Sequence, residues 1–334
     1  MKTRTTIFVL LLTLALTPEG MAQQKLAQTG LKFLNVISDA RAVALGGGMT
    51  AYEGFSSTMF LNPAGIARLR HNVNFSVGRT EWIADISHTF GSVAFKPWDG
   101  EYGVVGLFVQ SVDYGELHET VRSTNAQAYV ELGTFKPSAL ALGLTYARAV
   151  NDEFSFGLTA KLAHQYLGNG VTTLLSNGFA RGSENSVDVA AFDFGILYHL
   201  PFKGFDFGMT VRNFSREARF IDDDFQLPLT FKIGLAINWM DVLAMSKEDQ
   251  EFRLYVDAEH PRDYQEQVRI GGEYTFLQMF SLRAGYVSGT DEEGMSFGIG
   301  HEKQYDKLWF GLDYAYTAFG VFGGVHRFSF QFSL

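Results

Sequence analysis

The chain has 334 residues, of which 46% are hydrophobic and 15% aromatic, with a formal charge of −9 and no cysteine. The lack of cysteine excludes disulfides, zinc–thiolate sites, cysteine nucleophiles and an amino-terminal lipid anchor. The negative charge and the scattered Lys and Arg residues argue against a nucleic-acid partner.

The first residues have the pattern of a secretory signal peptide. Lys2 and Arg4 precede an apolar stretch from Ile7 to Leu16, and Ala22 ends a small-residue cleavage site. The apolar stretch is too short for a spanning helix. We expect residues 1–22 to be a signal peptide, with a retained anchor as the alternative.

Residues 23–71 do not alternate like strands. Asp39 and the glycines Gly46 and Gly47 are typical of the start and the end of a short helix. Pro63, after Asn62, predicts a break or the first position of a second short helix.

From residue 72 onward, apolar and polar residues alternate in runs bounded by Gly, Asn, Asp or Pro, which predicts about 14 strands. The clearest strands are 140–148, 154–166, 205–212, 227–239, 268–276, 280–286, 295–300, 308–316 and the terminal run. Weaker ones are 72–79, 86–96, 102–112, 188–198 and 252–259.

The connections between these strands sort by length. If the first strand starts in the periplasm, the connections on that side are short, with one exception. The other side carries Tyr114–Lys136, Leu167–Asn185 and Ser215–Gln226. This sorting is typical of a transmembrane antiparallel β-barrel and has no reason to occur in a soluble sandwich. We therefore predict an all-β barrel over residues 72–334 in the outer membrane of a diderm bacterium, in contact with lipid and lipopolysaccharide.

The last strand supports this prediction. Phe328, Phe330, Phe332 and Leu334 share one face, which would close the barrel toward lipid. The ending also resembles the carboxy-terminal signal that barrel-insertion machinery reads, although that signal usually ends in Phe or Trp.

A barrel of this size has a lumen wider than its own side chains fill. Residues 23–71 are therefore expected to form a plug, with a periplasmic tail as the alternative. Charged residues on the inward faces must then pair with the plug or with one another. They are Lys161, Arg212, Lys232, Arg269, Glu273, Arg283 and Asp313.

The amino-terminal block resembles the signature of the PorV/PorQ family, outer-membrane barrels similar in fold to the FadL long-chain fatty-acid transporters. The matching positions include Asp39, Arg41, Gly46, Gly47, Asn62, Pro63 and Gly65. The resemblance implies a component of type IX protein secretion that meets the translocon, receives secreted cargo and passes it to surface-attachment proteins. The expected contact residues lie in two outer loops and are Tyr129, Phe135, Leu174 and Phe179.

The alternative function is a FadL-like channel for hydrophobic small molecules. Such a channel needs an apolar pocket and a kinked wall strand that opens sideways. The region from Ile83 to Phe95 is the best place for a kink, because its alternation switches face around Gly91.

No catalytic, cofactor-binding or metal-binding pattern is present, so we expect a protein that is not an enzyme and has no cofactor. The eight histidines are dispersed, without metal-ligand spacing. The run Asp222–Asp224 is the best candidate for a hard cation, with a solvated acidic loop as the favoured alternative.

Overall fold

The alternation that begins after residue 72 folds into a closed antiparallel barrel. The structure, a computed structural model, describes residues 29–124, 126–174, 180–220, 223–243, 245 and 250–334. Fourteen strands form the wall, which confirms the predicted fold class. In order they are β1 (Val73–Glu81), β2 (Ser87–Phe95), β3 (Val104–Asp113), β6 (Ser138–Ala149), β7 (Phe154–Leu174), β8 (Ala180–His199), β9 (Phe205–Ser215), β12 (Thr230–Asn238), β13 (Gln250–Pro261), β14 (Gln267–Phe276), β15 (Phe280–Ser288), β16 (Glu293–Tyr305), β17 (Leu308–Phe319) and β18 (Gly324–Ser333).

The carboxy-terminal strand closes the ring. β18 pairs with β17 on one side and with β1 on the other, so that Phe332 lies opposite Phe75. Phe328 and Phe330 point away from the lumen, whereas Arg327 on the opposite face is only 1% exposed. Because both edges of β18 are paired, the aromatic end of the chain leaves no free strand edge.

The two faces of the wall differ in polarity in strands such as β12. In β12, Lys232 faces the lumen and is buried, whereas Ile233 and Leu235 lie on the exposed outer surface. A closed barrel with an apolar exterior satisfies every backbone group of its wall and can therefore span a bilayer. The predicted outer-membrane location and lipid contact agree with this architecture.

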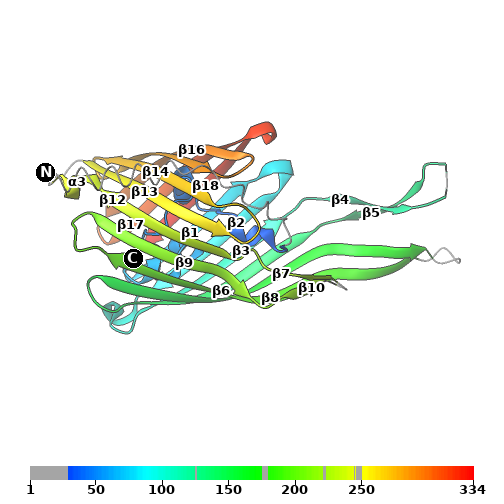
Figure 1. Cartoon of the computed structure of the whole chain (residues 1–334), viewed down its shortest axis with the longest axis horizontal. Helices are drawn as coiled ribbons and strands as arrows, with labels where there is room; N and C mark the ends of the chain where they lie inside the picture. Colours follow the sequence, from blue (N-terminus) through cyan, green and yellow to red (C-terminus); the bar gives the residue numbers. More distant parts are fainter. Residues whose placement is uncertain (1–28, 125, 175–179, 221–222, 244, 246–249) are drawn as a thin grey trace.

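Long and short connections lie at opposite ends of the barrel. We call the end with the long loops the outer end, as in outer-membrane barrels, and the other the inner end. At the outer end, β7–β8 and the separate hairpin of β4 (Leu117–Arg122) and β5 (Tyr129–Phe135) extend far beyond the wall (Figure 1). The other outer elements are η4 (Ile83–Asp85), β10 (Ala218–Phe220), β11 (Asp223–Phe225) and η6 (Gly320–Phe322). Those at the inner end are η5 (Pro97–Gly100) and α3 (Trp239–Val242).

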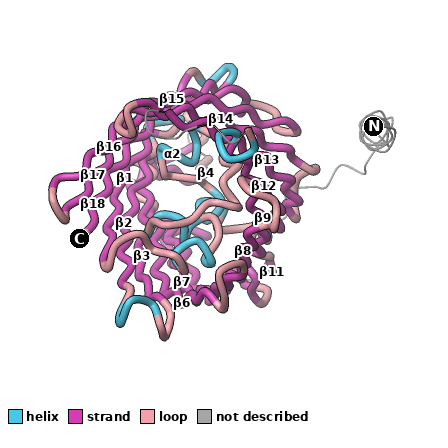
Figure 2. The backbone as a smooth tube through the Cα atoms, turned by 90° about the vertical axis from the view of Figure 1, so that its left-hand side faces the viewer, coloured by secondary structure: helices cyan, strands magenta, loops and turns pink. Residues whose placement is uncertain are grey.

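The segment before β1 lies inside the ring of strands, where Figure 2 shows its helices and loops. Its elements are η1 (Lys32–Asn35), α2 (Ala40–Ala44), η2 (Ser56–Phe60) and η3 (Pro63–Ile66). We call residues 29–72 the lumen segment. In the described part of the chain, no helix is long and apolar enough to cross a bilayer. The expected signal peptide lies outside the described residues.

The expected kink in β2 is wrong. Gly91 pairs with Val77 of β1 and with Val109 of β3 in an unbroken register, and burial alternates through the whole strand. Gly91 faces outward, where the missing side chain leaves the backbone ladder unaffected.

Candidate functional site

The lumen segment runs from the outer end of the barrel to the inner end. At the outer end, the Gly30 amide donates to the Gln226 carbonyl at 3.0 Å, and Lys32 forms an ion pair with Asp263. At the inner end, an Arg68 guanidinium nitrogen donates to the Asn151 carbonyl at 2.8 Å. The segment is therefore fixed to the wall at both ends.

The Asp39–Arg41 pair fastens α2 to the wall at mid-height. Asp39 caps the helix by accepting a hydrogen bond from the Ala42 amide at 2.8 Å. The Arg41 guanidinium forms ion pairs with Glu273 of β14 and Glu302 of β16, both at 2.9 Å. A buried cation is tolerated because these carboxylates replace its hydration.

The inward charges predicted from the sequence pair with one another as well as with the lumen segment. Arg283 contacts Glu273 at 2.7 Å and Asp313 at 2.5 Å. Further pairs are Lys161–Asp193, Lys232–Glu259 and Arg269–Glu259. The Arg269 guanidinium also donates to the Gly46 carbonyl at 2.9 Å, so this network reaches the residues that end α2.

Asn62 and Pro63, two of the positions on which the expected PorV/PorQ resemblance rests, pack closely against glycines of the wall. The Asn62 amide nitrogen donates to the carbonyls of Thr50 and Ile196, while its oxygen accepts from the Ala64 amide. A β-carbon at Gly195 of β8 would overlap Asn62 Oδ1, and one at Gly157 of β7 would overlap the Pro63 backbone. These wall glycines are needed for close approach of the lumen segment.

Gly65 and Gly47 each need to be glycine. A β-carbon at Gly65 would lie 2.5 Å from Thr58 Oγ1, inside the lumen segment. Gly47 follows α2 with a φ of +74°, a backbone conformation that favours glycine.

A cavity of about 410 Å³ opens at the outer end, between the lumen segment and the wall. Its apolar surface comes from residues that are far apart in the sequence: Val36, Ile37, Trp82, Pro261, Tyr264 and Phe319. Trp82 packs edge-on against Phe319 with ring centroids 4.9 Å apart. We call this space the outer cavity.

Charged side chains surround the apolar surface of the outer cavity. Lys32 lies over the Tyr264 ring at 4.4 Å, and Arg327 lies over the Trp82 ring at 5.2 Å. The remaining charged lining residues are Glu259, Arg269, Asp291, Glu292 and Glu293. The cavity thus combines an apolar surface with seven charged side chains.

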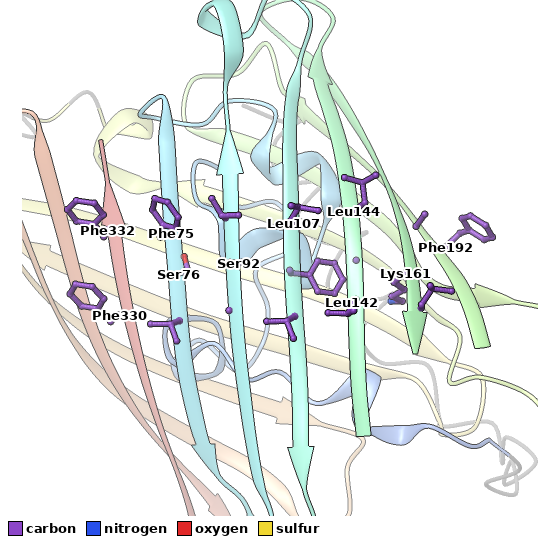
Figure 3. A pocket seen from close by; sticks show the side chains of 18 of the residues that line it. Phe75, Ser76, Ser92, Leu107, Leu142, Leu144, Lys161, Phe192, Phe330 and Phe332 are labelled. Atoms are coloured by element: carbon purple, nitrogen blue, oxygen red, sulfur yellow. The ribbon is translucent and has the colours of Figure 1, made fainter. Parts of the chain in front are cut away.

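A second apolar feature lies on the lipid-facing side of the wall, where Figure 3 shows Phe75, Leu107, Leu144, Phe192 and Phe330. It is a depression of about 1160 Å³ across β18, β1, β2, β3, β6, β7 and β8. Most of its large apolar side chains are exposed, although Phe108 and Lys161 are buried, and the membrane would cover the exposed ones. We therefore do not count it as a solvent-accessible site.

Two polar cavities lie at the inner end of the described structure. One of about 310 Å³ is lined by Glu53, His199 and Asp206, among others, and His199 Nδ1 lies 2.6 Å from Asp206. The other, of about 410 Å³, contains Arg41 and Arg253 beside acidic partners. Most of these charges pair with neighbours. Residues of the lumen segment line both cavities.

The loop residues expected to contact partners have mixed positions. Tyr129 of β5 is 44% exposed, beyond the barrel rim. Phe135 instead packs at the base of the hairpin, where its ring occupies the space beside Gly168 of β7. Leu174 belongs to β7, but its side chain is not described, and Phe179 lies outside the described residues.

Two residues of the acidic run, Asp223 and Asp224, belong to β11, whereas Asp222 lies outside the described residues. Arg219 and Asp224 form a bidentate ion pair at 2.8 and 3.1 Å, and these hydrogen bonds lower the pKa of the Asp224 carboxyl. Among the residues that the structure describes, no cluster of three or more His, Cys, Asp or Glu side chains could hold a metal ion.

The sequence did not reveal the outer cavity. Its lining residues come from the lumen segment and from four separate turns, and only closure of β18 against β1 brings Arg327 opposite Thr80, near Trp82. One signal was present: Arg327 is the single charge on the inward face of β18, whose other inward residues are Val325, Ser329, Gln331 and Ser333.

No protein-family model and no curated protein matches the chain. Solved structures do match it. The Pseudomonas putida toluene transporter TodX has a TM-score of 0.57 at 13% identity, covering 93% of this chain and 98% of TodX. The Ralstonia pickettii toluene transporter TbuX has a TM-score of 0.55 at 11% identity, covering 89% and 98%. A Pseudomonas aeruginosa FadL homologue has a TM-score of 0.52 at 12% identity, covering 93% and 98%. At these identities the similarity establishes the fold, so the chain has the FadL-like fold of outer-membrane barrels.

Proposed function

We propose that the protein takes up hydrophobic small molecules across the outer membrane and that the outer cavity is where they bind first. The observation that carries this proposal is the position of the cavity: it lies at the outer end, next to η1, where the lumen segment meets the wall. The FadL-like fold supports it, because the solved structures with this fold include toluene transporters.

Passage beyond the outer cavity requires movement of the lumen segment. Leu31, Phe33 and Leu34 are buried against the upper wall, where they pack on apolar residues that include Val112 and Leu227. This cluster closes the lumen beside the cavity. A bound molecule that displaces η1 would open the route, and the ion pairs of Arg41 below would keep the rest of the segment in place.

The proposal is tested by the rate at which radiolabelled butylbenzene enters cells that produce the protein. We expect several-fold faster uptake than in cells without it, and a loss of the increase in Val36→Trp, which fills the cavity. Val77→Trp is the matched control, because Val77 is 48% exposed on the lipid-facing surface. Equal uptake with and without the protein would refute the proposal.

A second candidate is the secretion role implied by the PorV/PorQ resemblance, with partners that dock on the outer hairpins. One observation favours it: β4 and β5 project beyond the rim and expose Leu117, Tyr129 and Leu132. A two-stranded hairpin is marginally stable alone, so exposed apolar residues on it suggest a docking surface. The proposed partners are a secretion translocon, surface-attachment proteins and secreted cargo.

Deletion of residues 115–136 tests this candidate. The deletion removes the hairpin but leaves the β3–β6 pairing, which begins at Asp113 and Ser138. Cargo display should fall while the barrel remains folded. Unchanged display, with folding verified by heat-modifiable electrophoresis, would eliminate the hairpin as a docking site.

A further inference from the structure

Arg327 is a buried cation that no acidic side chain neutralises at close range. Its side chain belongs to β18, is 1% exposed and lines the outer cavity. Nε donates to the Ile37 carbonyl at 3.1 Å and Nη1 to Thr317 Oγ1 at 3.0 Å. Within the described part of the chain, no carboxylate lies within 4.0 Å of it.

Most other buried cations in the described lumen have a carboxylate partner. Arg41, Arg269, Arg283, Lys161 and Lys232 each have a carboxylate at 2.5–2.9 Å. A buried charge without such a partner destabilises the fold. Two neutral acceptors and one aromatic face compensate the charge of Arg327 only in part.

Arg212 is the useful comparison. It is also buried and has no ion pair within the described residues, and it donates to the Leu34 carbonyl at 2.9 Å. Arg212 does not line the outer cavity, however, whereas Arg327 does. Among the described residues, Arg327 is the one cation that lines this cavity without an ion pair.

The other charged groups around Arg327 define what fits beside it. His88 is buried, and its ring packs against the Trp82 ring that Arg327 also contacts. Glu293 also lines the cavity and interacts electrostatically with Arg327 without forming an ion pair, and Asp291 and Glu292 extend this acidic rim. Arg327 is thus buried next to the aromatic walls. Asp291, Glu292 and Glu293 are less buried, and the buried Glu259 is already paired with Arg269 and Lys232.

We propose that Arg327 binds the acid group of an amphipathic monoanion, such as a carboxylate on an apolar ring or short chain. The carboxylate accepts hydrogen bonds from the guanidinium, and the apolar body lies against Ile37, Trp82 and Phe319. The acidic rim repels anions that carry more than one charge or lack an apolar body, which gives selectivity by exclusion. This inference rests on the proposed function and specifies the ligand of the same site.

The test compares binding of 4-butylbenzoate with that of its uncharged analogue, 4-butylbenzyl alcohol, to the full chain in lipid nanodiscs. Empty nanodiscs correct for partitioning into lipid. Hydrogen bonds to a charged group predict that the acid binds about 10-fold more tightly or better. Arg327→Gln should remove this preference, Arg327→Lys should restore part of it, and the matched buried variant Arg212→Gln should keep it.

The outcomes separate this inference from the function on which it rests. Equal binding of acid and alcohol by the wild-type protein overturns the role of Arg327 but leaves a site for hydrophobic molecules. A preference that survives in Arg327→Gln overturns it as well. Binding of neither compound to the wild-type protein overturns both proposals. The wild-type comparison decides the matter even if Arg327→Gln fails to fold.

Discussion

At the level of single residues, the buried ion pairs of the lumen are expected to stabilise the barrel. Arg41 joins α2 to two strands, and its removal leaves Glu302 without its cation and Glu273 with Arg283 alone. Removing one partner of a buried pair typically costs roughly 3–5 kcal/mol. We expect Arg41→Ala to lose about 3 kcal/mol, because Glu273 keeps one partner. Urea unfolding followed by heat-modifiable electrophoresis measures this loss.

The matched control is Arg219→Ala. Arg219 also pairs with a carboxylate, that of Asp224, but its side chain is 61% exposed and lies in an outer hairpin. Exposed ion pairs contribute little, so this variant should unfold like the wild type. If both variants unfold at the same urea concentration, the lumen network does not stabilise the barrel.

A single β-carbon is expected to change how tightly the lumen is closed. In Gly195→Ala the new methyl group would overlap Asn62 Oδ1, so η3 must shift away from the wall. We expect higher ion conductance in planar bilayers than for the wild type. Gly91→Ala is the control, because its β-carbon would lie 3.5 Å from Val109 Cγ1, an ordinary contact on the outer surface. Identical conductance of the two variants would show that the fit of Asn62 does not seal the lumen.

At the scale of elements, the sequence predicted the strands that show alternating polarity. It missed features that depend on how the sheet closes. Strands such as β12 were readable because one face must be apolar and the other polar. The hairpin β4–β5 was not, since most of its residues are exposed and no core imposes a pattern. The face switch around Gly91 was misread, because glycine has no side chain to mark its face.

The same distinction applies to the site. The short helices near Asp39 and Pro63 were readable from caps and breaks, which are local signals. The outer cavity was not readable, because it depends on how the lumen segment packs against four turns. Its position follows from register: Thr80 pairs with Arg327 across the β1–β18 seam. Sequence periodicity predicts which residues form strands, but the β1–β18 pairing exists only once the sheet has closed.

For the whole molecule, the direction of the lumen segment decides which end meets incoming molecules. Thr29 lies at the outer end, bridged to Gln226, and β1 begins at the inner end with Val73. The segment therefore passes the outer cavity first and the polar inner cavities last. Displacement that starts at η1 would open the lumen from outside, while Arg68 and its partners at the inner end hold the segment to the wall.

This orientation can be measured on intact cells. The native chain has no cysteine, so Thr29→Cys and Arg70→Cys each introduce a single thiol. A membrane-impermeant maleimide should label Thr29→Cys on intact cells, since that position lies at the outer end and is partly accessible. Arg70→Cys, exposed at the inner end, should be labelled only after the outer membrane is permeabilised. Tyr264→Cys, in an outer turn and 46% exposed, reports that the reagent reaches the surface. The reverse pattern would be labelling of Arg70→Cys on intact cells and protection of Tyr264→Cys. It would mean that the barrel has the opposite orientation. The outer cavity would then lie in the periplasm, where it could not receive molecules from outside.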